Sequence, residues 1–519
     1  MAKEISIVVS PEVAASEKSY TQVAARELGI SINQIASVRV KRQSIDARGR
    51  TIKVNLTLMV YVDDEREESS YRFEYRDVRS APEVILVGSG PASLFAALRL
   101  IELGLRPIIL ERGKDVHSRK IDLAQINRNE VIDADSNYCF GEGGAGTYSD
   151  GKLFTRSKKR GDCTRALHIL YNHGSAEEIL YQAHPHIGTN KLPTVIENIR
   201  NTIIHWGGEV HFGCRVTDLI LKDNRLLGVV TEAGERIMAQ ATILATGHSA
   251  RDIYELLHRK GVILESKPYA MGVRVEHPQE LIDSIQYKMP HRGEYLPAAA
   301  YTLVSQVNGR GAYSFCMCPG GFIVPAGVRS GESVVNGMSP SQRNSKFANS
   351  GIVTEIRESD FAHLLPEYGV LAGLKYQQQF EELAFANGGG AQIVPAQRLT
   401  DFIRAKHSSS LGVTSYHPGM QSSNMREWMP EVIYSSLKGG FEAFGAKMRG
   451  FVTEEAMVLG VESRTSSPVR VPRDKETLEH IQIKGLFPAG EGAGYAGGII
   501  SAGIDGERVA ESIANFIKR

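Results

Sequence analysis

The stretch Glu83-Val84-Ile85-Leu86-Val87-Gly88-Ser89-Gly90-Pro91-Ala92-Ser93 decides the fold of this chain. Its apolar half predicts a buried strand, and the residues that follow predict a tight turn into a helix through residues 94–103. Gly88 permits the turn, and Gly90 lets a pyrophosphate approach the backbone without meeting a Cβ atom. The free N–H groups and the positive dipole end of the helix favour such an anion.

A second predicted strand, residues 107–110, ends at Glu111. An acidic side chain at the tip of this strand suits the hydroxyl groups of an adenosine ribose. The third position of the glycine pattern is Ser93, where Gly or Ala is usual, so the glycine motif alone is a weak signal. The order strand, turn, helix, strand and terminal Glu is stronger, and it predicts a dinucleotide site. The alternative is a structural turn with no ligand.

The composition sets limits on the kind of protein. A length of 519 residues suggests two to four domains. Lys and Arg number 60 against 59 Asp and Glu, so the net charge of +1 gives no general attraction to nucleic acid or an anionic membrane. No apolar run approaches the ~18 residues of a membrane span, and the apolar residues 5–9 are too short a run for a signal peptide. We expect a cytoplasmic protein.

The five cysteines are scattered and form no CxxC motif, which argues for a reducing compartment and against a disulfide framework. Cys316 and Cys318 have the spacing of one face of a strand. We interpret them as two core thiols rather than metal ligands, and we predict no metal site.

Residues 1–80 are predicted to form a separate module. Residues 5–9 are strand-like, residues 17–28 have helical spacing, and residues 35–45 and 52–62 alternate like an antiparallel pair. This βαββ order suggests a small α+β, ferredoxin-like unit, and the polar residues 67–80 are expected to cross to the next domain.

The antiparallel pair of this module is basic. An RNA-binding or acidic-partner surface is one interpretation, and a solvated sheet edge protected by charge is the commoner one. We expect no nucleic acid as a partner. The basic residues are Arg39, Lys41, Arg42, Arg48, Arg50 and Lys53.

The middle of the chain adds a glycine-rich loop and a set of short strands. Four glycines stand between positions 141 and 146, where the backbone could come close to a ligand; a flexible surface loop is the alternative. An amphipathic helix is predicted over residues 194–206. The strands predicted at residues 210–212, 216–221, 226–231 and 236–238 form a β-meander, which leads into a buried strand that ends at Thr246-Gly247.

The C-terminal stretch repeats the pattern of a strand with an acidic tip. Residues 486–490 read as a strand ending at Glu491, and a glycine-rich loop then leads into a helix over residues 499–517. This helix start makes a second electropositive pocket. One dinucleotide could use both pockets, with its phosphates at the first and a flavin edge at the second.

These features resemble the FAD-binding fold of the glutathione-reductase and p-hydroxybenzoate-hydroxylase group. The resemblance is carried by Gly88 and Gly90 with Glu111, by the meander ending at Gly247, and by the C-terminal acid and glycines. More narrowly, GVRVEHP (272–278), FANSG (347–351), RTSSPVR (464–470) and PAGEGAGYAGG (488–498) resemble bacterial FAD-dependent dehydrogenases of unassigned substrate, of the NAD(FAD)-utilising type. The resemblance implies FAD, and it implies that Glu491 binds the ribityl chain.

Two absences narrow the chemistry. The CxxxxC motif of disulfide reductases is missing after Glu111, and so is a second GxGxxG unit for NAD(P)H. A nicotinamide donor would therefore bind transiently, without its own Rossmann domain. A quinone, another flavoprotein or a small iron–sulfur carrier could serve as the electron partner instead.

The expected architecture is a doubly wound α/β FAD-binding domain (81–267 and 483–519) that is Rossmann-like with three layers in the order ββα. We also expect an inserted α+β cap domain (268–482) and the N-terminal module (1–80). The expected function is hydride transfer between a small-molecule substrate and flavin N5. The alternatives are an FAD-dependent RNA-modifying enzyme and a binding protein with a structural flavin.

The candidate site has two parts. The catalytic candidates are His248, Lys152 and Arg464, chosen among polar residues that also include Asp150, His277 and His417. The predicted cofactor contacts are Gly88, Ser89, Gly90, Pro91, Ala92, Glu111, Arg112, Gly143, Gly144, Ala145, Gly146, Val216, Thr246, Gly247, Gly490, Glu491, Gly498, Ile499 and Ile500.

Overall fold

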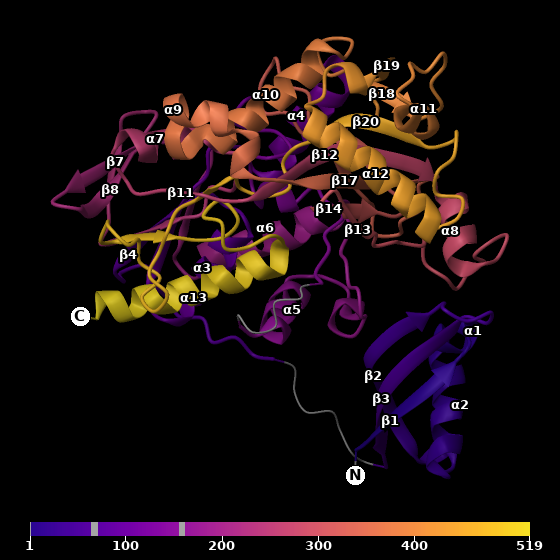
Figure 1. The fold of residues 1–519 in the computed structure, drawn as a ribbon. Helices are drawn as coiled ribbons and strands as arrows, with labels where there is room; N and C mark the ends of the chain where they lie inside the picture. Colours follow the sequence, from indigo (N-terminus) through magenta and orange to yellow (C-terminus); the bar gives the residue numbers. More distant parts are fainter. Residues whose placement is uncertain (1, 64–70, 155–160, 519) are drawn as a thin grey trace.

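The computed structural model describes residues 2–63, 71–154 and 161–518, so part of the expected crossing segment, residues 67–70, lies outside the described residues. A five-stranded parallel sheet of order β22-β10-β4-β5-β6 brings the early and the last parts of the chain together (Figure 1). Both β4 and β22 pair with β10. The strands are β4 (Glu83–Val87), β5 (Arg106–Leu110), β6 (Glu209–His211), β10 (Ala241–Leu244) and β22 (Leu486–Pro488).

Different layers cover the two faces of the parallel sheet. Val84 and Leu86 of β4 pack against helices α3 (Pro91–Glu102), α6 (Leu192–His205) and α13 (Ile499–Ile517). Ile85 and Val87 point the other way, to β7 (Val216–Lys222) and β8 (Arg225–Thr231). Successive side chains of a strand point to opposite faces, so an unbroken apolar run is what a sheet covered on both sides requires. The fold is therefore mixed α/β around a parallel sheet.

The expected four-stranded meander is wrong in its first strand. Strands β7, β8 and β9 (Arg236–Met238) form an antiparallel sheet by themselves, whereas β6 pairs in parallel with β5. A strand of three residues is too short to show a periodicity. Its place follows from α6, which leads directly into it as the crossover helix of a parallel pair.

A seven-stranded sheet of order β13-β14-β17-β12-β20-β18-β19 forms the second large unit. Apolar residues of β12, such as Val273 and Val275, pack in one core with α10 (Ala372–Ala386) and α12 (Glu431–Lys447), and α12 lies across the sheet in Figure 1. Arg274, between those two valines, therefore points to the opposite face. The strands are β12 (Tyr269–Pro278), β13 (Val304–Val307), β14 (Arg310–Cys318), β17 (Phe347–Ile356), β18 (Val394–Arg398), β19 (Met420–Ser422) and β20 (Met457–Glu462).

The N-terminal unit has the expected βαββ order, with an extra short helix. Its antiparallel sheet has the order β1-β3-β2, and the ferredoxin-like fold stays a prediction. Gln43 exchanges backbone hydrogen bonds with Tyr181 and Ala183, and Arg39 lies 3.7 Å from Glu177, so part of the basic hairpin contacts the rest of the chain. The elements are β1 (Lys3–Val9), α1 (Pro11–Ala14), α2 (Glu17–Leu28), β2 (Ile35–Asp46) and β3 (Lys53–Val62).

The remaining α-helices and β-strands lie within or between these units. They are α4 (Val116–Asn129), α5 (Cys163–Asn172), α7 (Arg251–Arg259), β11 (Glu265–Ser266), α8 (Gln279–Tyr287), β15 (Phe322–Pro325), β16 (Val335–Met338), α9 (Leu365–Tyr368), α11 (Leu399–Arg404) and β21 (Val469–Arg470). Among the described residues, no helix has the length and apolar character needed to cross a bilayer.

Candidate functional site

A cavity of about 400 Å³ lies at the carboxyl ends of β4, β5, β10 and β22. Open α/β sheets bind their ligands at this edge. Residues 88–92 and residues 489–491 with 497–499 line the same cavity, so the two glycine-rich helix starts converge as the sequence predicts. Residues of the seven-stranded unit and its loops, including Phe315, Asn336 and Thr465, close the cavity from another side.

Most of the predicted site residues line this cavity. Gly143 and Ile500 do not: a Cβ atom on Gly143 would lie 2.0 Å from Thr147 Oγ1, and Ile500 is buried in the helix layer. The predicted residues that line the cavity are Gly88, Ser89, Gly90, Pro91, Ala92, Glu111, Arg112, Gly144, Ala145, Gly146, Lys152, Val216, Thr246, Gly247, His248, Arg464, Gly490, Glu491, Gly498 and Ile499.

The two glycines of the first turn meet different requirements. Gly88 has a φ of +95°, and a Cβ atom there would lie 2.7 Å from the carbonyl oxygen of Ala245, so only glycine fits. Gly90 has an ordinary φ of −72°, and nothing lies within 4 Å of where its Cβ would be. Gly90 is also the N-cap of α3 and provides no side-chain hydrogen bond. The N–H groups of this helix start therefore remain available to an anion.

Glu111 is buried and already accepts four hydrogen bonds. The N–H and Oγ–H groups of Ser89 donate to its Oε2, each at 2.8 Å, and the N–H groups of Gly113 and Gly141 donate to its Oε1 at 2.9 and 3.0 Å. A carboxylate has about four lone-pair sites, so these donors occupy them. Glu111 thus joins the glycine turn at residues 88–90 to the second glycine-rich loop, at residues 141–146.

Arg119 holds the second glycine-rich loop in place. Its guanidinium is fully buried and donates to the backbone carbonyls of Asn137, Tyr138, Glu142 and Gly144 at 2.8–3.1 Å. Burial lowers the pKa of this guanidinium, and nearby anionic groups act in the opposite direction. The loop is therefore a fixed wall of the cavity.

The start of α13 has the same open character as the start of α3. Its N-cap, Gly498, provides no side-chain hydrogen bond, and a Cβ atom there would contact nothing within 4 Å. The buried Asp505 accepts from the Gly490 N–H at 2.8 Å and pairs with Arg473. Arg473 also lies 3.9 Å over the ring of Tyr495, which fixes the C-terminal loop beside α13. Both helix starts therefore fit a ligand with anionic groups.

His248 and Glu491 meet at the C-terminal side of the cavity. Nδ1 of His248 lies 3.5 Å from Oε1 of Glu491, and their side chains are 12% and 31% exposed. Both line the cavity and both can carry a proton. They come from the loops after β10 and β22, which are neighbours in the parallel sheet.

Lys152 lies beside two sulfur atoms. Its Nζ is 3.9 Å from Cys316 Sγ, 3.7 Å from Cys318 Sγ and 3.4 Å from Oδ2 of Asp150. The interpretation of both cysteines as core thiols is wrong for Cys316, which lines the cavity, whereas Cys318 is buried. The register of β14 against β17 shifts between Phe315 and Cys318, and Cys316 has a φ of +45°. This β-bulge breaks the alternation on which the prediction rested.

Arg464 belongs to a buried ionic network at the cavity wall. It donates to Glu381 at 2.9 and 3.1 Å and to Glu332 at 2.8 Å. Arg251 donates to the same two carboxylates at 2.8 Å. Burial raises the pKa of Glu381, but Arg251 and Arg464 outweigh it and lower that pKa to about 2. Two buried carboxylates are thus each paired with both Arg251 and Arg464.

The other two candidate histidines lie away from the cavity. His277 is 0% exposed, and its Nε2 lies 2.8 Å from the carbonyl oxygen of Phe451. His417 is exposed on a loop after α11. Among the described residues, no cluster of three or more His, Cys, Asp or Glu side chains is placed to hold a metal ion.

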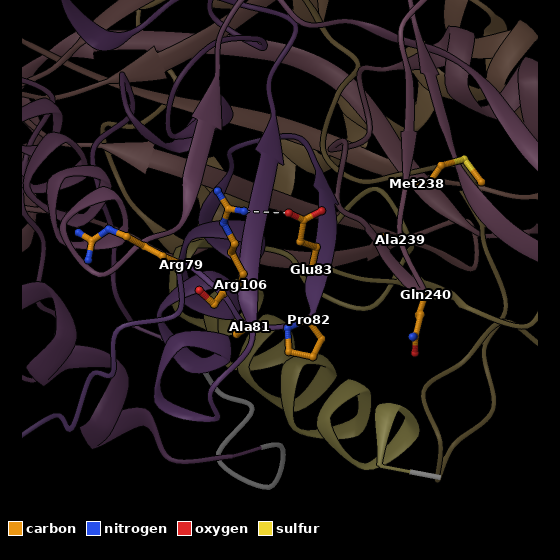
Figure 2. A pocket seen from close by; sticks show the side chains of 9 residues that line it. Arg79, Ala81, Pro82, Glu83, Arg106, Met238, Ala239 and Gln240 are labelled. Atoms are coloured by element: carbon orange, nitrogen blue, oxygen red, sulfur yellow. Dashed lines mark hydrogen bonds and ion pairs between the residues drawn. The ribbon is translucent and has the colours of Figure 1, made fainter.

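A second hollow of about 420 Å³ lies at the amino ends of β4 and β5 (Figure 2). Figure 2 shows that Arg106 and Glu83, two of its lining residues, pair with each other. Arg106 Nη1 lies 2.8 Å from Glu83 Oε1. Among the described residues that line it, none is a glycine or the start of a helix. It lacks the features that fit the first cavity to a dinucleotide.

Sequence comparisons agree with the geometry of the cavity. A family described as FAD-dependent protein, C-terminal domain-like, matches residues 268–465, and a domain of unknown function (DUF8436) matches residues 1–61. A protein of Clostridium beijerinckii, named only as uncharacterized, is 40% identical over a 510-residue alignment that covers 94% of this chain and 94% of that protein.

Solved structures resemble this chain only distantly. The flavin-dependent brominase Bmp2 has 13% identity and a TM-score of 0.37, with 85% of this chain and 80% of that chain covered. A geranylgeranyl bacteriochlorophyll reductase-like protein of Thermoplasma acidophilum has 12% identity and a TM-score of 0.36 at 85% and 80% coverage. Likeness this weak says nothing about the reaction of this chain.

The fold, the cavity and the matched domain define a flavoprotein, and its cofactor is FAD. Within that class, the chain belongs to the same family as the Clostridium beijerinckii protein.

Proposed function

We propose that this protein is an FAD-dependent oxidoreductase that transfers a hydride between a small-molecule substrate and flavin N5. The observation that carries the proposal is the convergence of two helix starts and a second structural unit on one cavity. The proposal includes the division into an FAD domain (81–267 and 483–519), a cap (268–482) and an N-terminal module (1–80). NAD(P)H or a protein carrier is proposed only as a transient electron partner.

The proposed FAD contacts follow from the open backbone groups of the cavity. The start of α3 at Gly90 would bind the pyrophosphate, because its N–H groups have no side-chain acceptor. A ribose hydroxyl at Glu111 would replace the Ser89 Oγ–H, the one side-chain donor among its four. The start of α13 at Gly498 would stabilise negative charge at the flavin N1/C2=O edge.

FAD, when bound, supplies an acceptor for two electrons and one proton. The chain must then orient the substrate and accept the proton that the substrate loses. We propose His248 as this proton acceptor, with Glu491 orienting it through Nδ1. We propose that Arg464 shapes the wall, since its donors already serve Glu332 and Glu381.

Anaerobic reduction of the bound flavin with a panel of donors, NADH and NADPH included, tests the proposal. We expect at least one donor to bleach the flavin absorbance in a single turnover. The variant His248→Gln should retain FAD and lose about 10²-fold or more of that rate. A flavin that dithionite reduces but no donor reduces would point to a structural cofactor instead.

A further inference from the structure

Cys316 and Cys318 form a cluster for which hydride transfer has no use. Cys316 lines the cavity that we assign to FAD, and Cys318 lies behind it at 0% exposure. Lys152 Nζ lies within 4 Å of both sulfurs, and Cys318 Sγ donates to the Cys316 carbonyl oxygen at 3.3 Å. In a flat strand, positions two apart hold their side chains parallel; the bulge at Cys316 removes that constraint.

The charges around the two sulfurs favour one thiolate. Arg274 is neutralised by Glu462 at 2.8 Å, and its guanidinium also donates to the Cys316 carbonyl. Asp150 is shared between Lys152 and Arg343, which leaves one cation in excess. A side-chain hydrogen bond between the two cysteines lowers the pKa of Cys316, and Lys152 and Arg274 add to this effect against the opposing effect of burial. The same hydrogen bond, together with burial, raises the pKa of Cys318. His186, the neighbouring imidazole, has a pKa lowered by burial and by Arg343, so it adds no charge at neutral pH.

We propose that Cys316 and Cys318 are a redox-active pair that exchanges two electrons with FAD in the same cavity. Oxidation of the Cys316 thiolate and the Cys318 thiol breaks one S–H bond and forms one S–S bond, and the two electrons and that one proton would convert FAD to FADH−; the reverse reaction reduces the disulfide. Cys316, which lines the cavity, is the sulfur that a substrate can reach, and the buried Cys318 resolves the bond. The substrate class is then a small thiol or disulfide. This inference rests on the proposed redox function of the cavity.

An anaerobic dithionite titration of the holoprotein, oxidised beforehand in air, tests the pair. We expect the wild type to take up four electrons per FAD, two for the flavin and two for the disulfide. The variants Cys316→Ser and Cys318→Ser should take up two. The matched control Cys163→Ser should take up four, because Cys163 lies at the start of α5, outside the cavity lining.

Alkylation of the wild type gives a second readout that needs no variant to fold. Trypsin should release residues 311–329, which hold both cysteines and no third one. We expect this peptide to carry no label in the oxidised protein and two labels after reduction. If a donor reduces the flavin but the peptide carries two labels both before and after reduction, the redox pair is overturned and the proposed function stands. A chain whose flavin responds to no donor, and which takes up only two electrons, would overturn the pair and the proposed function together.

Discussion

Gly88 and Gly90 lie in one turn, but a Cβ atom on Gly88 would meet the protein backbone and one on Gly90 would not. Substitution by alanine should therefore affect stability differently at the two positions. Gly88→Ala places a Cβ 2.7 Å from a backbone oxygen at a φ of +95°, so we expect the apo protein to lose about 1–3 kcal/mol of unfolding free energy. Gly90→Ala meets no protein atom and has an allowed φ, so its cost should stay near 1 kcal/mol or less.

The same pair should behave differently toward the cofactor. A methyl group at position 90 occupies the space above the α3 N-terminus, so the FAD Kd should rise at least about tenfold, or 1.4 kcal/mol. Urea unfolding of the apo forms and a fluorescence titration with FAD measure the two effects. If Gly90→Ala binds FAD with wild-type affinity, the pyrophosphate does not bind at this turn.

Arg464 should matter for stability more than for substrate binding. Arg464→Met leaves Arg251 to pair with both Glu332 and Glu381. Breaking such a network should lower the unfolding free energy by about 3–5 kcal/mol. Arg329→Met is the matched control: Arg329 contacts the same Glu332 but is 50% exposed, so its loss should cost at most about 1 kcal/mol. Unchanged unfolding of Arg464→Met, with a raised KM for an acidic substrate, would assign Arg464 to substrate binding.

His277 should make the protein sensitive to mild acid. Burial lowers its pKa from 6.5 to about 4, although the hydrogen bond to Phe451 acts in the opposite direction. The folded state therefore keeps the imidazole neutral while the unfolded chain takes up a proton, and stability present above pH 6.5 is lost as the pH falls toward 4. The expected loss is about 1.4 kcal/mol per pH unit, or roughly 3 kcal/mol in all.

Urea unfolding between pH 7 and 4.5 measures this loss. His277→Gln keeps a donor for the Phe451 carbonyl and cannot titrate, so its stability should fall less steeply than that of the wild type. Parallel curves for the two proteins would show that His277 does not carry the effect.

At the scale of elements, α3 and α13 must approach closely for both to reach the cavity. A Cβ atom on Gly506 of α13 would lie 1.9 Å from the carbonyl oxygen of Ala92 in α3, so Gly506→Ala must push the helices apart. Overpacking of this kind costs about 1–3 kcal/mol, and FAD affinity should fall as well, because Ala92 lines the cavity.

The control for this helix contact is Asn515→Ala, an exposed position on the same helix. It should change stability by no more than about 0.5 kcal/mol. Thermal unfolding and FAD titration of the two variants test this prediction. Equal stability and equal FAD affinity in the two variants would mean that the contact at Gly506 does not set the helix spacing.

Local signals predicted the elements that form the site. The helix expected at residues 499–517 is α13, and the strands before both glycine turns are present, because each is marked by an apolar run and a glycine. Neither the pairing of β6 with the parallel sheet nor the place of Cys316 in the cavity wall could be predicted, since a three-residue strand and a bulge show no periodicity. Arg119 and Asp505 were missed because a charged residue in a sequence gives no sign that it will be buried.

At the scale of the molecule, the cavity is assembled from parts that lie far apart in the chain. The parallel sheet supplies both helix starts, and the seven-stranded unit and its loops supply Phe315, Cys316 and Arg464. FAD should therefore stabilise both units together. At 100 times its Kd, FAD should add about 2.7 kcal/mol to the unfolding free energy. Calorimetry with and without FAD measures this, and a shift confined to one of two separate transitions would contradict a shared site.

The central claim is that one FAD molecule joins the start of α3 to the start of α13. A crystal structure of the protein with FAD bound tests it most directly. We expect the pyrophosphate beside Gly90 and the flavin ring beside Gly498, between the parallel sheet and the seven-stranded unit. FAD bound elsewhere, or in the reverse orientation in this cavity, would contradict the account.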